Sequence, residues 1–387
     1  MKKRILKSSL FIFTIIGLIS CNQEVKVPAD SFTVSGTVTG LDTEFMTRSV
    51  TDKNGKRSSD TIFVKDGTFT YTAKIDQAEH IIFWPNVERT IKRSGRGYYP
   101  AKSSQFAFLA KPGEHIVFKG EVTDFINAYP SGTKGNDDLA TINSKIFPLL
   151  NASVNYTLKR GKLEKDEPRI AIITDSITQI EEEVVRLKSE FVKNNPASEA
   201  AIWYLSDMMV RSQLTNEEAV EVFNKFDKNL ESDTYYKEVA TRVKGIESTL
   251  IGKTVPDFTS NKTLDGKEFT LSSLKGKYVL IDFWGIWCGP CVEEMPKVKE
   301  YSLKYAKKLT VLGVNSGDTK EKIIDFINPK GYDWQQVLSG KDTDDLVLKF
   351  NVAGFPTKFI IDPEGKILHR FLGNSEEAFV ELDKLLK

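Results

Sequence analysis

The segment "IDFWGIWCGPCVEEMP", residues 281–296, decides how the last third of this 387-residue chain is interpreted. An apolar run ends at Trp284, and Cys288 and Cys291 follow it three residues apart. The residues before the cysteines are typical of a buried strand, and those after them are typical of a helix. Two sulfurs at such a junction could form a metal site, a structural crosslink or a redox pair.

The first two alternatives fit the chain poorly. A structural zinc site needs four ligands, usually cysteines and histidines. The three histidines lie far apart without ligand spacing: His80, His115 and His369. A disulfide between residues three apart closes a loop too small to add much stability. We therefore expect no metal and no cofactor, and we favour the redox pair.

The start of a helix suits a reactive sulfur. Unpaired backbone N–H groups and the positive end of the helix dipole would stabilise Cys288 as a thiolate, which is the attacking form of cysteine. Pro290 is tolerated there because its missing N–H falls in the first turn. Cys288 is expected to be the exposed attacker, and Cys291, one turn further and more deeply placed, would resolve its mixed disulfide.

The N-terminus predicts export and a lipid anchor. Four basic residues precede an apolar stretch, residues 10–19, that is too short to span a bilayer comfortably. The ending Leu18-Ile19-Ser20-Cys21 resembles a bacterial lipobox. Residues 1–20 are therefore predicted to be a lipoprotein signal peptide, Cys21 the lipidation site and residues 21–30 a tether. An ordinary signal peptide with a chance cysteine at its end is the alternative.

The charge of the mature chain argues against nucleic acid as a partner. Removing residues 1–20 leaves 54 − 4 = 50 basic residues against 53 acidic ones, a net charge of about −3. Export allows disulfides, but only Cys288 and Cys291 would remain to form one inside the mature chain. The fold therefore cannot depend on a disulfide framework.

The sequence predicts three domains after the tether. Residues 31–130 have alternating runs and a hairpin signal at Asp66-Gly67, which indicate an antiparallel β-sandwich-like domain or small barrel. Residues 131–248 change to a helical period, most clearly in a helix that ends before Pro196. Residues 251–387 alternate strands and helices and predict a mixed, mostly parallel sheet covered on both faces. The helix after the cysteines is expected to kink at Pro296.

The cysteine segment resembles a known superfamily. Trp287-Cys288-Gly289-Pro290-Cys291 matches the thioredoxin active site. Its surroundings from residue 271, together with "IGKTVPDFT" at residues 251–259, resemble the TlpA/ResA-like branch of membrane-tethered thiol-disulfide oxidoreductases. The runs at residues 60–71 and 108–120 resemble a β-domain of unknown function that precedes the redox domain in many envelope lipoproteins. This resemblance implies a thioredoxin fold with an added strand and helix within residues 318–339.

The resemblance also implies roles for residues around the cysteines. Asp282 matches the buried acid that moves protons for the resolving cysteine, and Glu294 matches the glutamate of the ResA-like branch; having both departs from the pattern. Phe355 and Pro356 match the cis-proline loop opposite the cysteines, where the backbone of Phe355 would pair with a substrate peptide. Trp287 would be a partly exposed cover beside the attacking sulfur, whereas Trp284 would belong to the core.

The function predicted from the sequence is a lipid-anchored oxidoreductase in the cell envelope. It would face the periplasm, on the outer membrane because Asn22 is not the aspartate that retains lipoproteins at the inner membrane. It would reduce protein disulfides, with apocytochrome c among the implied substrates, and a membrane-borne donor would supply electrons. Two alternatives stay open: a binding or scaffold lipoprotein with an accessory redox domain, and a thiol peroxidase.

Overall fold

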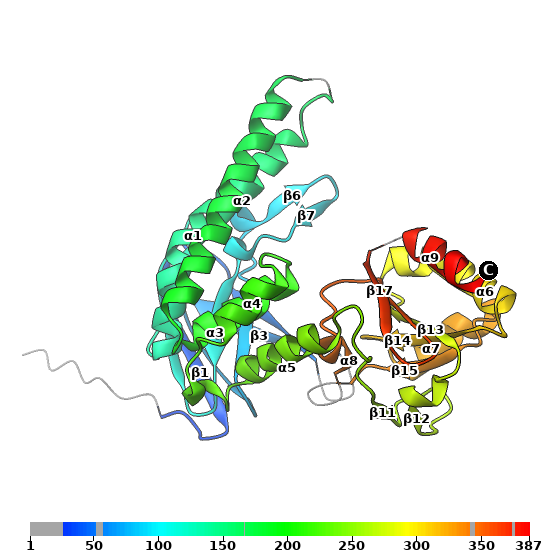
Figure 1. Cartoon of the computed structure of the whole chain (residues 1–387). Helices are drawn as coiled ribbons and strands as arrows, with labels where there is room; N and C mark the ends of the chain where they lie inside the picture. Colours follow the sequence, from blue (N-terminus) through cyan, green and yellow to red (C-terminus); the bar gives the residue numbers. More distant parts are fainter. Residues whose placement is uncertain (1–25, 52–56, 166, 341–344, 374–375) are drawn as a thin grey trace, which may run out of the picture.

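The computed structural model describes residues 26–51, 57–165, 167–340, 345–373 and 376–387. The predicted signal peptide and Cys21 lie outside these residues. Figure 1 shows two bodies, one built from the β-rich and helical residues and the other from the redox residues, which meet near helix α5 (Thr234–Ser248). No helix in the described part is long and apolar enough to cross a membrane.

The N-terminal region is a β-sandwich-like domain of two unequal layers. The main sheet has the strand order β10-β9-β1-β4-β3-β2, and β5 pairs with β8 in the second layer. The strands are β1 (Ser31–Thr39), β2 (Phe45–Thr51), β3 (Arg57–Lys65), β4 (Thr68–Lys74), β5 (Glu79–Phe83), β6 (Lys92–Ser94), β7 (Gly97–Tyr99), β8 (Phe106–Ala110), β9 (His115–Val122) and β10 (Ile126–Ser131). The sheet departs from the expected antiparallel pattern because β1 and β9 are parallel.

Local sequence explains how this domain forms. Asp66 and Gly67 both have positive φ, 50° and 70°, at the predicted turn between β3 and β4; a two-residue hairpin turn of this type favours Asp-Gly. Alternation along β1 turns Val34 toward a core of aromatic and branched side chains between the two layers. That core includes Phe83 and Phe108, whose rings pack edge to face.

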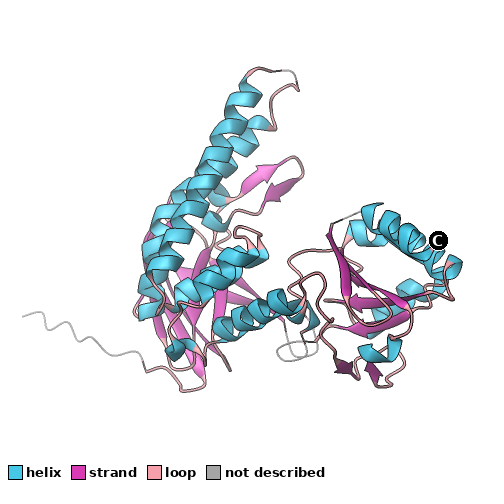
Figure 2. Ribbon diagram, in the orientation of Figure 1, coloured by secondary structure: helices cyan, strands magenta, loops and turns pink. Residues whose placement is uncertain are grey.

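Five helices follow, and helices cover one side of the β layers (Figure 2). They are α1 (Lys134–Arg160), α2 (Arg169–Asn194), α3 (Glu199–Val210), α4 (Asn216–Phe223) and α5 (Thr234–Ser248). The first two form a long hairpin that projects past the sheet (Figure 1). The side chains of Ser198, Thr215 and Asp233 cap α3, α4 and α5. The long helix α1, which contains Pro148, is absent from the helices that the sequence predicts.

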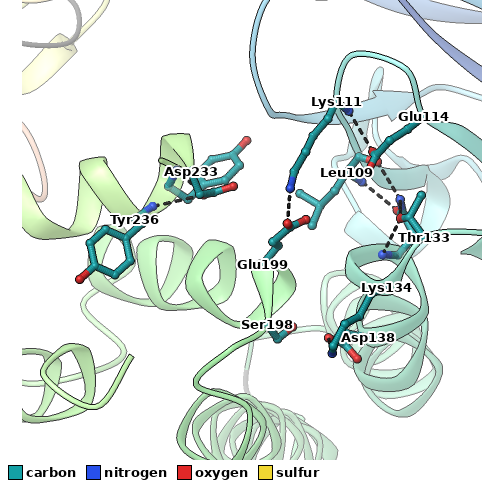
Figure 3. A network of polar contacts seen from close by, with 12 residues as sticks. Leu109, Lys111, Glu114, Thr133, Lys134, Asp138, Ser198, Glu199, Asp233 and Tyr236 are labelled. Atoms are coloured by element: carbon teal, nitrogen blue, oxygen red, sulfur yellow. Dashed lines mark hydrogen bonds and ion pairs between the residues drawn. The ribbon is translucent and has the colours of Figure 1, made fainter. Parts of the chain in front are cut away.

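Polar contacts join the helical region to the β-domain. The fully buried side chain of Asn136 in α1 accepts a hydrogen bond from the backbone N–H of Leu109 and donates one to its carbonyl, at 3.0 and 2.8 Å. Lys111, just after β8, forms an ion pair with Glu199 at the start of α3 (Figure 3). The N-terminal body therefore combines both predicted regions in one packed unit.

The C-terminal body has a thioredoxin-like sheet with the order β15-β14-β13-β16-β17. Its elements are β11 (Thr259–Ser260), β12 (Phe269–Thr270), β13 (Tyr278–Trp284), α6 (Gly289–Lys304), β14 (Leu309–Asn315), α7 (Lys320–Ile327), β15 (Gln335–Leu338), α8 (Leu346–Lys349), β16 (Thr357–Ile361), β17 (Ile367–Leu372) and α9 (Glu376–Leu386). The sheet is half parallel rather than mostly parallel, since β16 and β17 pair antiparallel. Within residues 318–339, where the resemblance implies an added strand and helix, the structure has α7 followed by β15, and α6 continues through Pro296.

Strand alternation gives the two faces of this sheet different partners. Leu280 of β13 and Ile360 of β16 pack with α6 and α9, whereas their neighbours Ile281 and Phe359 pack on the opposite face, against α8. Side chains two residues apart on one strand share a face. Residues 282 and 358 therefore lie on the same face as Leu280 and Ile360, under α6.

The two bodies meet where α5 packs against α8 (Figure 1). Gly245 sits at the closest approach: a Cβ there would lie 2.8 Å from the carbonyl oxygens of both Leu348 and Lys349. The Arg242 guanidinium, which is buried beside it, donates to the carbonyl oxygen of Val352 at 3.4 Å. The joint thus depends on backbone contact that only glycine permits.

We expect Gly245→Ala to separate the two bodies without unfolding either. Alanine favours a helix interior over glycine by about 1 kcal/mol, so α5 itself should persist, but its methyl group must displace two backbone carbonyls of α8. Small-angle scattering should show a larger radius of gyration, and the 249–258 segment should be cut faster by protease. Gly161→Ala is the control, because a Cβ there would lie 3.6 Å from its nearest neighbour, the carbonyl oxygen of Thr157. An unchanged scattering profile for Gly245→Ala would contradict this account of the joint.

Candidate active site

The end of β13 and the start of α6 bring the two cysteines together. Cys288 is the N-cap of α6, and its Sγ accepts a hydrogen bond from the backbone N–H of Cys291 at 3.3 Å. The two sulfurs are joined in a disulfide. The predicted exposed attacker is wrong for this form, because Cys288 is only 5% exposed and Cys291 2%. Both sulfurs pack in a cluster with Ile286 and Phe355, which accounts for the burial.

A loop from the neighbouring strand holds the residues in front of the cysteines. The indole N–H of Trp287 donates to the carbonyl oxygen of Ser316 at 2.8 Å, and the Asp318 carboxylate accepts from the backbone N–H of Ile286 at 2.8 Å. Trp287 remains 58% exposed, as expected for a cover, whereas Trp284 is fully buried. Gly285 is required here because a Cβ would lie 2.3 Å from the Trp287 indole nitrogen. The sequence did not reveal the positioning role of Asp318.

The loop before β16 packs against Trp287. The Phe355–Pro356 bond is cis, and the Phe355 ring packs edge to face with Trp287 at 5.1 Å between centroids. Thr357 fixes the loop by donating from Oγ1 to the carbonyl oxygen of Gly354 at 2.7 Å. Among the described residues, no hydrogen bond engages the backbone N–H or C=O of Phe355. Its backbone is therefore available to an extended peptide.

Three buried charges lie on the α6 face of the sheet. Asp282 and Lys358 are direct partners on the antiparallel strands β13 and β16. The Lys358 ammonium lies 3.2 Å from the Asp282 carboxylate and 2.5 Å from that of Glu294, one turn after Cys291. Lys358 is 1% exposed. Burial alone lowers the pKa of Lys358, but the two carboxylates outweigh it, and its pKa is raised above the usual value.

Lys358 was not among the site residues that the sequence suggested. The structure brings Asp282 and Glu294, both predicted as site residues, together through this lysine. A signal was present, because "PTKFII" places one charged residue inside an apolar strand. A buried lysine is rare unless it is paired.

The described residues contain no group of three or more metal-ligating side chains. The histidines have separate surroundings: the His80 ring stacks on Trp203 at 4.0 Å, His115 hydrogen-bonds to Ser35, and His369 lies 3.8 Å from Glu381. The chemistry available at the candidate site is that of two sulfurs, a loop with an unengaged backbone at Phe355 and a buried set of charges.

Two known families match the chain. Redoxin matches residues 250–386, and a domain of unknown function, DUF4369, matches residues 32–139. The second match confirms the predicted β-domain of unknown function. Between them, residues 140–249 lie outside both matches.

Curated relatives match the C-terminal part. The thiol-disulfide oxidoreductase ResA of Bacillus subtilis is 36% identical over 138 residues, which are 35% of this chain and 75% of that protein. The thioredoxin-like protein YneN of the same organism is 33% identical over 159 residues, 38% of this chain and 84% of that protein. Among solved structures, the thioredoxin domain of a thiol-disulfide oxidoreductase from Bacteroides vulgatus is 32% identical, with a TM-score of 0.33, over 36% of this chain and 99% of that one.

Proposed function

We propose, for a chain that belongs to the family of thioredoxin-like thiol-disulfide oxidoreductases, that Cys288 and Cys291 are its redox pair and that it reduces disulfides of proteins in the cell envelope. The observation that carries the proposal is the position of Cys288. Its sulfur caps α6, receives the N–H of Cys291, and lies beside a loop whose Phe355 backbone is unengaged. A thiolate formed there gains the helix dipole and a hydrogen bond.

Each turnover moves two electrons. The Cys288 thiolate bonds to one sulfur of the substrate disulfide, and the other sulfur leaves as a thiolate that takes up a proton. Cys291, once deprotonated, bonds to the Cys288 sulfur and releases the second substrate sulfur. The cysteine pair ends oxidised and the substrate reduced, and a dithiol donor at the membrane must return two electrons and two protons to Cys288 and Cys291.

The buried charges are proposed to accept the proton that Cys291 releases. We assign the proton-accepting role to Glu294, which follows Cys291 by one helical turn, with Asp282 as its partner across Lys358. The Lys358 ammonium contacts both carboxylates and so holds Asp282 and Glu294 in one compact group. Trp287 and Phe355 would contact the substrate segment next to its disulfide.

The N-terminal residues support a location in the cell envelope. A basic start, a short apolar stretch and Cys21 fit a lipoprotein that is anchored to a membrane by lipid and faces the periplasm, with the outer membrane favoured by Asn22. Proteins with oxidised cysteines in that compartment are the proposed substrates, apocytochrome c among them.

The redox potential tests the direction of electron flow. We expect a midpoint potential for Cys288 and Cys291 near that of thioredoxin, about −270 mV, because a reductase must hold its electrons at low potential. The full-length chain carrying Cys21→Ser, so that only two thiols are counted, is equilibrated in glutathione buffers and labelled with maleimide. A midpoint near about −120 mV, that of a strong oxidant, would instead make the protein an oxidase. A pair that cannot be reduced at any potential would remove the redox function itself.

A further inference from the structure

A groove lies where the helical region meets the redox domain, beside the loop that carries Phe355. It encloses about 310 Å³. Its walls come from the α3–α4 connection on one side, including Ser212, Thr215 and Asn216, and from the segments around α8 and β17 on the other, including Asn351, Ala353 and Arg370. Neither body forms this groove alone.

Among the described residues, Arg370 is the only charged one that lines the groove. Its guanidinium donates to the carbonyl oxygen of Asn351 at 2.6 Å and lies over the Phe359 ring. No carboxylate of the described residues forms an ion pair with it, although most buried or half-buried cations of this chain have one: Lys92, Lys102, Lys188, Arg242 and Lys358. Burial lowers the pKa of Arg370, and no acid offsets that effect. A half-buried guanidinium without a carboxylate is suited to take one from a ligand.

The groove walls include the residues that end helices α3 and α8. Ser212 and Asn351 have φ of 53° and 46°, and they account for two of the four non-glycine residues with positive φ in the described chain. They line the groove from different bodies, and the Asn351 amide donates to the Asn216 side chain at 3.3 Å. Ser212 and Asn351 are each the left-handed residue that ends a helix. The N–H of the following residue donates back to a helix carbonyl in both cases, from Gln213 to Met208 and from Val352 to Val347.

The groove is close in sequence to the cis-proline loop of the active site. Ala353 lines it, and Phe355, two residues on, contacts Trp287. A peptide that pairs with Phe355 as a strand advances about 3.3 Å per residue, so a side chain that enters the groove would come from a position near the substrate cysteine in sequence. Leu372 borders the same path, since its side chain lies close to Gly354.

We propose that this groove binds a carboxylate side chain of the substrate protein, located a few residues from the disulfide that Cys288 attacks. The inference rests on the proposed function and adds a substrate class to it: envelope proteins with an aspartate or glutamate near the oxidised cysteine. It also gives the helical region a role in substrate binding, because Ser212, Thr215 and Asn216 line the groove whose cation, Arg370, belongs to the redox domain.

Single-turnover kinetics with peptide probes test the proposal. Each probe has one cysteine in a mixed disulfide with 5-thio-2-nitrobenzoate, and aspartate, or asparagine in a matched twin, two to four residues to either side. Release of the chromophore by the pre-reduced, full-length protein follows the attack of Cys288. At one position we expect the aspartate probe to bind on the order of tenfold more tightly than its twin, with the limiting rate unchanged.

Variants assign the preference to the groove. Arg370→Gln should remove it while leaving the asparagine twin unaffected, which also shows that the variant is folded. Asn216→Asp, which keeps the side-chain shape and offers Arg370 an internal carboxylate, should weaken it as well. Lys366→Gln, the same loss of charge at an exposed position of the β16–β17 hairpin, should retain it.

The outcomes distinguish a failure of the groove assignment from a failure of the proposed reductase function. Equal binding of all twins by the wild-type protein, or an equal loss for both twins in Arg370→Gln, would overturn the groove assignment and leave the reductase standing. Chromophore release no faster than in Cys288→Ser, with every probe, would refute the proposed function and the groove assignment with it.

Discussion

Cys288→Ser is expected to lower insulin disulfide reduction to the background rate of the dithiol donor, whereas Cys291→Ser is expected to stop after the first step. A serine hydroxyl at residue 288 cannot form the thiolate that attacks a disulfide at neutral pH. In Cys291→Ser the attack proceeds, but nothing displaces the substrate, so a mixed disulfide accumulates on Cys288. Turnover is followed by precipitation of the insulin B chain, and the trapped adduct by intact mass.

The two variants control for each other. Both remove the disulfide of the oxidised form and change one sulfur to oxygen, so a general effect on folding should appear in both. Only an exchange mechanism predicts that one variant is inert and the other covalently trapped. The Cys21→Ser chain is the reference in each case. If Cys288→Ser turned over at the rate of that reference, or if the adduct formed on Cys291 instead, the assignment of attacker and resolver would be wrong.

The cysteine site could be predicted because its determinants are local. A strand, a tight turn, an N-cap and Pro290 follow one another within one short segment, and each has a recognisable pattern. The burial of Cys288 could not be predicted in the same way, because Phe355, which packs on it, comes from a distant part of the chain. Likewise, the pairing of Lys358 with Asp282 depends on the register of β13 against β16.

Helix α1 lies in the region predicted to be helical, but it was not predicted as an individual helix, for a different reason. Its buried residues include Asn136, Asn143 and Asn151, which a hydrophobic pattern counts as exposed positions, and Pro148 lies in its interior. These asparagines find partners in other elements: Asn143 accepts from the Tyr204 hydroxyl and Asn151 donates to Asp124. A polar residue that satisfies its hydrogen bonds through tertiary contacts leaves no periodic signal. The strand-rich and redox regions, whose buried faces are apolar, did leave one.

Lys358→Met is expected to destabilise the redox domain by about 3–5 kcal/mol, the cost of leaving buried charge without its partner. The side chains have similar length, so the change removes the ammonium without opening a large cavity. Asp282 and Glu294 then face each other in a buried site, 4% and 6% exposed at their side chains, where repulsion and desolvation favour the protonated carboxyl. Urea unfolding of the full-length protein measures the loss.

The loss should depend on pH, with a definite sign. A carboxyl that prefers to stay protonated in the folded variant ionises freely in the unfolded chain, so stability falls as pH rises from the unfolded pKa, about 4, through the folded one. The difference between wild type and Lys358→Met should therefore be small near pH 4 and larger at pH 8. The same proton uptake should shift the pH profile of the Cys291 step toward alkaline pH, because an acceptor that already holds a proton cannot take another.

A second substitution separates charge from shape. Adding Glu294→Gln to Lys358→Met removes one carboxylate and should recover part of the lost stability, whereas Glu294→Gln alone should not stabilise the wild type. Lys297→Met is the control. Lys297 lies in α6, as Glu294 does, and pairs with the exposed Glu376. Its loss should lower the free energy of unfolding by no more than about 1 kcal/mol. If Lys358→Met lost equal stability at pH 4 and pH 8, or if Glu294→Gln failed to recover any, the lysine would be a packing residue. The proton of Cys291 would then need an acceptor other than this cluster.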